Sequence, residues 1–518
     1  MTRPKPITTM RPVRKNALLA ATVLSLYAAH AFADVKSAER AMTQQRYADA
    51  VAELQPLVKG GDTRAQADLG TLLILGQGLP RDDAAGFALL SHSAKAGDPM
   101  GDIGLALFYL LRQPGPDSYA KAEALYRKHA LEGNVFAEAG LGSLYLLGLG
   151  GPKNYPQAAH WLRLAADQNN ACAQNSLAYL YDNGLGVPRD GAMALRLYRQ
   201  AADQGLAVAQ NDLGSVYLAG RDVPTDYQQA YTLYQKAAAQ GLAQAYTNIG
   251  RLYNTGLGVK ADRAQAYEWM RKGADRGDWS AYDELGSLLY QGIDGKPDFK
   301  ASMAWYAKAA ALGDPVGQTG LGLIYEHGGG VPKDDAQAFA WYRKAANSGY
   351  ADAQVSVGRF YMLGRGVAKD NAEGMRWVRR AAQQGDANAQ GIAGSVYQHG
   401  TYAPVNYAAA LKWLTLAALA GNAKAEYDLG WTYMMGTGVA RDVRRGYAWL
   451  SVSASRGYEP AKKSIADNQM ALSLDQRSQA ERAAAAWQQG HNLVLGDEPP
   501  GYVGLSAFNL NAPFSPGE

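Results

Sequence analysis

The sequence predicts an all-α protein, a right-handed superhelical solenoid of tandem helix-turn-helix repeats. A small residue recurs every 36 residues along most of the chain, and three other residue columns keep the same step. The segments between these columns carry apolar residues at helical spacing, as in Ala338 to Ala346. At 518 residues the chain exceeds the size of one compact core. A repeat array avoids that limit because each unit packs only on its neighbours.

The small-residue column defines the repeat. Each member follows an apolar residue in the first helix of its unit, which we call helix A, and lets a second helix approach closely. Nine members are spaced by 36 residues, and two earlier members follow steps of 34 and 38, which predicts eleven units over residues 63–458. The members are Gly70, Gly104, Gly142, Ala178, Gly214, Gly250, Gly286, Gly322, Gly358, Gly394 and Gly430.

Two columns mark the ends of the second helix, helix B. Asp or Asn before the helix is expected to accept hydrogen bonds from the free N–H groups of the first turn. Gly, or Asn169, after the helix suits the left-handed conformation that ends it. The expected N-caps are Asn154, Asp190, Asp226, Asp262, Asp298, Asp334, Asp370, Asn406 and Asp442, and the expected helix ends are Asn169, Gly205, Gly241, Gly277, Gly313, Gly349, Gly385, Gly421 and Gly457.

An aromatic column in helix B keeps the same spacing. Large rings at a repeated position are expected to fill the groove between neighbouring units. The members are Trp161, Leu197, Leu233, Trp269, Trp305, Trp341, Trp377, Trp413 and Trp449.

These columns resemble the Sel-1-like repeat, a longer relative of the tetratricopeptide repeat. Its pattern, AxAxxxLGxxYxxGxGVxxDxxxAxxWYxKAAxxG, is matched closely by Gly322 to Gly349 with its lead-in and by Ala351 to Gly385. Two units depart from it: the second has the loop RQPGPDSY, and the unit starting near Ala387 reads GTYAPVN. The resemblance implies an exported bacterial protein of a family that serves envelope assembly, exopolysaccharide export and regulation, or contact with host proteins.

The segments outside the repeats predict export and capping. Residues 1–33 have a basic start, an apolar stretch and the cleavage pattern Ala31-Phe32-Ala33, so we expect a signal peptide and a mature start at Asp34. Residues 34–62 are expected to form an N-terminal capping helix and residues 459–489 a C-terminal helix pair, with Trp487 as an apolar anchor. Residues 490–518, rich in Pro, Gly and Asn, are expected to be a mobile tail.

Charge and cysteine content narrow the function. Residues 1–33 hold five basic residues and no acidic one, and without them the formal charge changes from +4 to −1. Nucleic acid is therefore a poor candidate partner. The single cysteine, Cys172, excludes an internal disulfide and a cysteine-based zinc site. Once the signal is cleaved, the protein is not expected to be integral to a membrane, because no other segment is long and apolar enough.

No set of residues predicts catalysis, a cofactor or a metal site. His327 and His399 share a repeat column but are two units apart, too far for one metal ion. The GLGV, GGGV and GRGV loops lack the strand and the Lys-Ser/Thr of a phosphate-binding loop. Some cysteine-rich relatives resemble β-lactamase-type binders, and they carry paired cysteines in each repeat. This chain has one cysteine, so we do not expect such an activity. The prediction is a protein that is not an enzyme.

Partner binding is expected on the residues one after and three before each small residue, which we call the A-helix face. Helix A should line the concave groove of the solenoid, where aromatic and Arg side chains are typical binding anchors. Trp431 has an alternative role, closing the last repeat against the C-terminal cap. The candidate groove residues are Tyr179, Arg251, Arg359, Tyr427 and Trp431.

The predicted function is a non-enzymatic protein–protein interaction scaffold in the cell envelope. The periplasm is the first predicted location, and secretion is the second. One alternative is a secreted or surface-exposed binder of host proteins. Another is an envelope scaffold associated with polysaccharide export or regulation, since scattered Tyr and Trp residues suit a polysaccharide groove.

Overall fold

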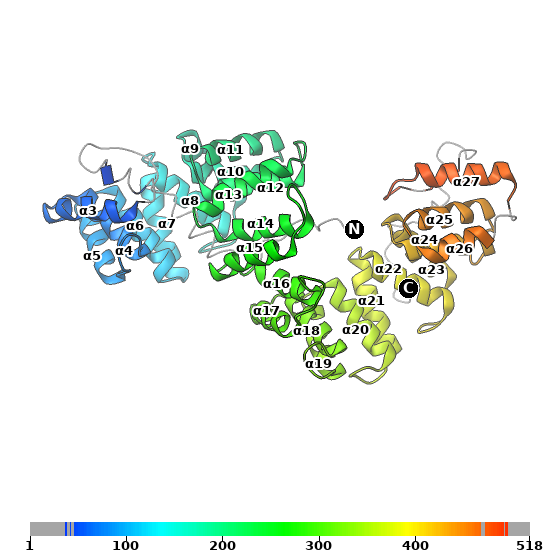
Figure 1. Ribbon diagram of the computed structural model, residues 1–518. Helices are drawn as coiled ribbons and strands as arrows, with labels where there is room; N and C mark the ends of the chain where they lie inside the picture. Colours follow the sequence, from blue (N-terminus) through cyan, green and yellow to red (C-terminus); the bar gives the residue numbers. More distant parts are fainter. Residues whose placement is uncertain (1–36, 39–41, 43–45, 468–471, 492, 496–518) are drawn as a thin grey trace. The chain divides into compact units, whose positions relative to one another are not determined.

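The computed structural model describes residues 37–38, 42, 46–467, 472–491 and 493–495, and all regular structure in these ranges is helical (Figure 1). The predicted signal peptide, residues 1–33, lies outside them. The chain divides into two compact units, Met1–Asp278 and Trp279–Glu518. Each unit is built from tandem helix pairs, as the sequence predicts.

The first unit contains helices α3 to α15. They are α3 (Tyr47–Lys59), α4 (Thr63–Leu75), α5 (Asp83–Lys95), α6 (Pro99–Arg112), α7 (Pro116–Ala130), α8 (Val135–Leu147), α9 (Tyr155–Asp167), α10 (Ala171–Asn183), α11 (Gly191–Asp203), α12 (Ala207–Ala219), α13 (Tyr227–Ala239), α14 (Ala243–Thr255) and α15 (Arg263–Asp275).

The second unit contains helices α16 to α27. They are α16 (Ala281–Gln291), α17 (Phe299–Ala311), α18 (Pro315–His327), α19 (Asp335–Asn347), α20 (Ala351–Leu363), α21 (Asn371–Gln383), α22 (Ala387–His399), α23 (Tyr407–Leu419), α24 (Ala423–Met435), α25 (Val443–Ser455), α26 (Glu459–Asp467) and α27 (Leu474–Ala486).

From α4 to α25, each even-numbered helix is a helix A and the following odd-numbered helix is its helix B. Within each unit, the two helices of a pair pack against each other, and each helix B packs against the helix A that follows it in the same unit. Several successive A helices also touch directly, among them α16 and α18, and α22 and α24. Successive B helices between α5 and α25 make no contact of similar extent. Within each unit, the A helices therefore lie closer together than the B helices.

The helix ends follow the predicted columns. Asp334 begins α19, and its carboxylate accepts a hydrogen bond from the backbone N–H of Gln337 at 2.9 Å. Asn406 does the same for Ala409 before α23, at 3.0 Å. Asn169 is one of two described non-glycine residues with a positive φ, 65°, and so takes the left-handed conformation that glycine adopts in the other repeats.

The small-residue column lies where helices A and B approach closely, as predicted. A Cβ atom on Gly322 would lie 2.6 Å from the ring of Tyr342, and one on Gly394 would lie 2.7 Å from Leu414. The side chain that fills this space is the one directly after the aromatic column. Its members are Leu162, Tyr198, Tyr234, Met270, Tyr306, Tyr342, Val378, Leu414 and Leu450, all buried.

The aromatic column itself is less uniform than predicted. Trp341 is only half-buried, and the ammonium of Lys344 lies 3.9 Å from the centre of its ring. Trp413 and Trp449, near the C-terminal end, are fully buried. The ring of Trp341 packs against the cluster formed by Tyr306, Leu321 and Ile324 of α17 and α18, so it lies between neighbouring units as predicted but is only partly enclosed there.

The C-terminal helices cover the last repeat. Ser473 caps α27 in a reciprocal pair of hydrogen bonds with Gln476, and the ring of Trp487 packs 5.6 Å from that of Trp449. The chain then returns over α23 and α25, where Leu493 and Leu495 are buried. These two residues were assigned to the mobile tail that begins at Gly490, and their burial corrects that assignment. Residues 496–518 lie outside the described residues.

Candidate partner-binding site

The two candidate residues in the first unit are parts of its packed surface. Tyr179 is half-buried against the hydrophobic core of the unit. Arg251 is also half-buried, and its guanidinium donates to the side-chain oxygen of Asn248 at 2.6 Å. Neither side chain extends freely from the A-helix face.

A chain of polar side chains continues from Asn248 along the A helices of this unit. The Asn248 amide donates to Asn211 on α12 at 2.8 Å, and Asn175 on α10 donates to Asp212 at 3.1 Å. These hydrogen bonds join successive A helices side chain to side chain. The A-helix face is therefore closed by internal contacts from α10 to α14.

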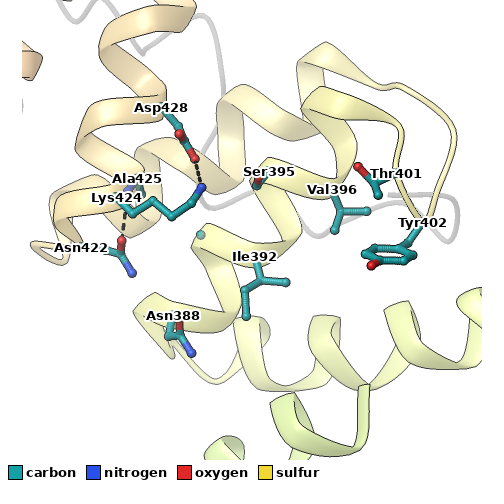
Figure 2. A pocket seen from close by; sticks show the side chains of 11 residues that line it. Asn388, Ile392, Ser395, Val396, Thr401, Tyr402, Asn422, Lys424, Ala425 and Asp428 are labelled. Carbon is teal, nitrogen blue, oxygen red and sulfur yellow. Dashed lines mark hydrogen bonds and ion pairs between the residues drawn. The ribbon is translucent and has the colours of Figure 1, made fainter. Parts of the chain in front are cut away.

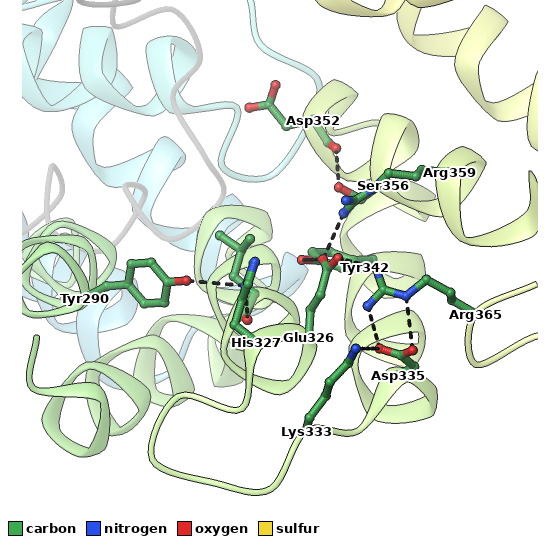
Figure 3. Close-up of polar contacts among 11 residues, drawn as sticks. Tyr290, Glu326, His327, Lys333, Asp335, Tyr342, Asp352, Ser356, Arg359 and Arg365 are labelled. Carbon is green, nitrogen blue, oxygen red and sulfur yellow. Dashed lines mark hydrogen bonds and ion pairs between the residues drawn. The ribbon is translucent and has the colours of Figure 1, made fainter. Parts of the chain in front are cut away.

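In the second unit, Arg359 belongs to a cluster around Glu326 (Figure 3). The side chain of Glu326, at the end of α18, is only 4% exposed. It accepts hydrogen bonds from the Tyr342 hydroxyl at 2.8 Å, from Arg359 at 2.9 Å and from Arg365 at 2.7 Å. Arg365 also pairs with Asp335 through two hydrogen bonds, at 2.6 and 3.1 Å.

The electrostatics of this cluster favour a permanent ion network. Burial alone would raise the pKa of Glu326, but the Tyr342 hydroxyl and the guanidinium groups of Arg359 and Arg365 together outweigh burial and lower it. The hydrogen bond from Arg365 also lowers the pKa of Asp335. Lys333 adds a third cation 3.8 Å from Asp335, and the cluster ties α18, α19 and α20 together. The Arg359 side chain is paired with Glu326 but remains 48% exposed.

Tyr427 and Trp431 on α24 pack towards the C-terminal cap. Their rings are 6.5 Å apart in an edge-to-face arrangement, and the ring of Tyr427 lies 5.3 Å from that of Tyr458, just before α26. This geometry favours the alternative role in which Trp431 closes the last repeat. Tyr427 and Trp431 are thus in contact with each other, and the five candidate residues remain a predicted site.

A pocket opens between α22 and α24, on the A-helix face of the second unit (Figure 2). Its volume is about 360 Å³. The close-up shows Asp428 and Lys424 on one side and Val396, Thr401 and Tyr402 on the other, with Ile392 and Asn388 between them. The residues that line it are Asn388, Gly391, Ile392, Ser395, Val396, Thr401, Tyr402, Asn422, Lys424, Ala425 and Asp428.

The pocket exists because this repeat carries small side chains on the A-helix face. Gly391 and Ser395 stand three before and one after the small residue Gly394. A Cβ atom on Gly391 would lie 3.5 Å from the side-chain amide of Asn422, an ordinary van der Waals contact, so this glycine leaves room for a methyl group without a clash. The loop after α22 is the departing segment GTYAPVN, which places Tyr402 at the rim. Large anchor residues in the sequence do not predict this site, because its sequence signal is a lack of bulk.

The two walls of the pocket differ in chemistry. Lys424 donates to Asp428 at 2.6 Å, and Asn422 accepts from the backbone N–H of Ala425 at 3.0 Å, so the α24 wall is polar. The α22 wall combines the apolar side chains of Ile392 and Val396 with the polar side chains of Asn388 and Ser395. Such a pocket suits binding of an amphipathic group. Among the described residues, no group of three His, Cys, Asp or Glu side chains could hold a metal ion, and no helix could span a bilayer.

The Sel1 repeat family model matches ten segments of the chain, which together cover more than half of it. The protein belongs to the Sel1 repeat family. Of the eleven predicted helix pairs, the family model does not match the second, α6 and α7. The loop of this pair, RQPGPDSY, departs from the repeat pattern. The matched segments are 63–98, 135–170, 173–206, 207–242, 243–278, 279–314, 315–350, 351–386, 387–422 and 423–458.

Solved structures of other Sel1 repeat proteins resemble the chain. A protective antigen present in uropathogenic Escherichia coli strains is 28% identical, with a TM-score of 0.53, over 90% of this chain and 99% of the antigen. A Sel1 repeat protein from Oxalobacter formigenes is 34% identical, with a TM-score of 0.43, over 60% of this chain and 89% of that protein. No curated protein resembles the chain closely enough to count as a match. Sel1 repeats generally mediate protein–protein interaction.

Proposed function

We propose that this Sel1 repeat protein is a non-enzymatic scaffold that binds a protein partner on the A-helix face of its second unit. The observation that carries the proposal is the pocket between α22 and α24. At Glu326 in the second unit and at Asn248 in the first unit, side chains of neighbouring A helices are instead joined to each other. The pocket is a place where the face offers a partner space as well as polar and apolar contacts.

Binding is tested by filling the pocket. Gly391→Leu adds a side chain at the pocket lining beside Asn422, whereas Gly151→Leu adds the same side chain at an exposed loop glycine with nothing within 4 Å. Partners are captured by crosslinking and pull-down from the native envelope. We expect Gly391→Leu to weaken capture at least tenfold, or about 1.4 kcal/mol, and Gly151→Leu to leave it unchanged. Equal capture by both variants would place the working surface elsewhere.

We also propose that the protein acts in the cell envelope, first in the periplasm. The basic and apolar stretches of residues 1–33 and the Ala31-Phe32-Ala33 pattern support this. The mature protein is expected to begin at Asp34 and to be recovered from the periplasmic fraction. N-terminal sequencing that finds residues 1–33 retained on a membrane-bound protein would refute export by signal cleavage.

A second candidate location is the cell surface or the medium, where the scaffold would bind host proteins. It is favoured by the similarity to the protective antigen of uropathogenic Escherichia coli strains. Cell fractionation separates the two candidates. A protein confined to the periplasm supports the envelope scaffold, and a protein accessible to antibody on intact cells supports the host-binding alternative.

A further inference from the structure

A short segment after α27 closes the C-terminal end of the repeat array. We call residues 487–491 and 493–495 the C-terminal strap. Its first ring, that of Trp487, packs 5.6 Å from the ring of Trp449 on α25. The side-chain amide of Gln489 and the backbone N–H of Gly490 donate hydrogen bonds to backbone carbonyls at the end of α23. The strap is therefore held both to α23 and to α25.

Arg456, directly after α25, connects the strap to the interior of the last repeat. Its guanidinium lies 5.2 Å from the centre of the Trp487 ring. Its Nε atom lies 2.9 Å from a carboxylate oxygen of Glu426 on α24. A Cβ atom on Gly421 would lie 3.1 Å from the Gln489 side chain and 3.2 Å from the Arg456 guanidinium, so the strap and Arg456 meet at the end of α23. One cation thus contacts both the strap and a buried carboxyl group.

The position of Glu426 in the repeat suits a neutral hydrogen-bond donor. Four other repeats carry Gln there, and each amide donates to the backbone carbonyl eight residues earlier, at 3.1 to 3.4 Å. The four residues are Gln174, Gln210, Gln354 and Gln390. The corresponding carbonyl for Glu426 is that of Ala418. A protonated carboxyl group has an O–H to donate to it, whereas a carboxylate only accepts. The Oε2 atom of Glu426 is buried, and no described residue donates to it.

The charges around Glu426 do not offset its burial. Burial raises its pKa to about 7, and Arg456 is the one charged group that opposes this effect. The neighbouring helices α22 and α23 carry only His399 and Lys412, and neither contributes to the shift. Other charged side chains on α24 to α27 have partners of their own, among them Lys424 with Asp428, Arg445 with Asp442, Lys462 with Glu459, and Glu481 with Tyr447.

We propose that Glu426 is a proton switch for the C-terminal strap: its neutral acid keeps the strap closed on the last repeat, and its carboxylate loosens the strap. A buried carboxylate needs water, and water reaches it most directly past the side chain of Arg456, which is 33% exposed where it meets the strap. Loosening uncovers Trp449, which is 2% exposed in the closed form. The switch acts at the end of the array and does not depend on partner binding in the pocket between α22 and α24.

Hydrogen exchange of the full chain measures closure of the strap. A carboxyl whose pKa is raised in the closed form stabilises that form at low pH, and this contribution is lost as pH rises from 4.5 to about 7. After correction for the intrinsic pH dependence of exchange, backbone N–H groups of the strap are expected to lose at least tenfold protection between pH 5 and pH 7.5. Glu426→Gln has no proton to lose and keeps a donor for Ala418, so its strap should stay equally protected at both pH values.

Two further variants serve as matched controls. Glu138→Gln changes an acidic residue of the same column in the first unit, where Gln168 donates to the carboxylate at 2.8 Å, and it should leave exchange in the strap unchanged. Histidine side chains also change charge near neutral pH, so His491→Gln removes the histidine of the strap. The pH response should persist in this variant.

Four results would overturn the proposal. The first is equal protection of the strap at pH 5 and pH 7.5 in the parent protein. The second is a pH response in Glu426→Gln as large as that of the parent. The third is loss of the response in His491→Gln, which would assign the switch to that histidine. The fourth is an equal loss of protection in every helix of the second unit, which would mean unfolding of the unit and not opening of the strap.

Discussion

Two parts of the second unit are built from the same type of repeat but differ on the A-helix face. One is filled by paired side chains, and the other contains a pocket. Around α18 to α20, Glu326 accepts hydrogen bonds from Tyr342, Arg359 and Arg365, and the face is closed. Between α22 and α24, Gly391 and Ser395 leave it hollow. Both places are built from tandem helix pairs of the same length. The difference shows that a few side chains on helix A decide whether neighbouring repeats bind each other or leave room for a ligand.

Two buried glutamates make the same contrast in electrostatic terms. Glu326 has three hydrogen-bond donors, and its pKa is lowered. Glu426, on α24, is fully buried and faces one cation, Arg456, at 2.9 Å. Burial raises the pKa of Glu426 to about 7, against the opposing effect of Arg456. A single partner therefore does not compensate for the lost hydration of this carboxylate.

The largest expected effect concerns the core of the closed region. Tyr342 is fully buried and fills the space opposite Gly322, whereas Trp341 next to it is half-buried. Tyr342→Ala should lower the free energy of unfolding by about 3–5 kcal/mol, as other buried aromatic truncations do. Trp341→Ala should cost only about 1–2 kcal/mol. Denaturant melts of the two variants give the order, and a larger loss in Trp341→Ala would contradict our account of the groove.

The next effect tests the close approach itself. Gly322→Leu must push the Tyr342 ring away, because even a Cβ atom would lie 2.6 Å from it. The expected loss is about 1–3 kcal/mol from overpacking. In a repeat array such damage is confined to neighbouring units, so hydrogen exchange should show it in α18 to α20. Uniform protection across these helices would mean that they do not meet at this glycine.

The third prediction uses the two glutamates. A carboxyl whose pKa is raised in the folded state contributes stability at low pH and loses it as pH rises. For Glu426 this loss should fall between the ordinary value of 4.5 and about 7 and amount to about 1–3 kcal/mol. Glu326 has the opposite sign, so its contribution is present above 4.5 and is lost as pH falls below that value.

Glu426→Gln is expected to flatten the decrease in stability between about pH 5 and pH 8. Most other repeats carry Gln at this position, as in Gln354, whose amide donates to the Ala346 carbonyl at 3.3 Å. The introduced amide could donate in the same way to Ala418, eight residues earlier. Glu326→Gln should instead weaken the fold at neutral pH. If the free energy of unfolding changed with pH in the same way in the parent and in Glu426→Gln, the pKa of the Glu426 carboxyl would not be raised by the fold.

The sequence was sufficient to predict the helix pairs, because caps and glycine ends act locally. Asp334 and Asn169 perform their predicted roles through atoms at most three residues away. Contacts across repeats were harder to predict. Arg359 looked free in the sequence because its partner, Glu326, lies 33 residues earlier. The filling role of Tyr342 was also missed, although its column keeps the 36-residue step and the signal was present in the sequence.

The pocket was missed for a different physical reason. Binding sites are commonly sought through large or charged residues, since such residues supply most interface energy. Gly391 and Ser395 contribute almost none and act by leaving space. A small residue on a face that other repeats fill is readable in an aligned set of repeats, but the depth of the resulting space depends on how Tyr402 and Asp428 are placed by the fold.

The smallest expected effect on stability is the most informative about function. Gly391→Leu is in the middle of α22, where replacing glycine favours the helix by about 0.5–1 kcal/mol. A Cβ atom on Gly391 would make an ordinary contact with Asn422 at 3.5 Å, whereas one on Gly322 would clash with Tyr342 at 2.6 Å. We therefore expect a melting transition equal to or slightly above that of the parent, together with loss of partner capture. A glycine retained at a helix position where leucine stabilises the fold would be explained by the ligand that needs the space. A clear loss of stability in Gly391→Leu would show instead that the pocket beside Gly391 does not accept a leucine side chain. The difference between the pocket and the filled region around Glu326 would then not hold.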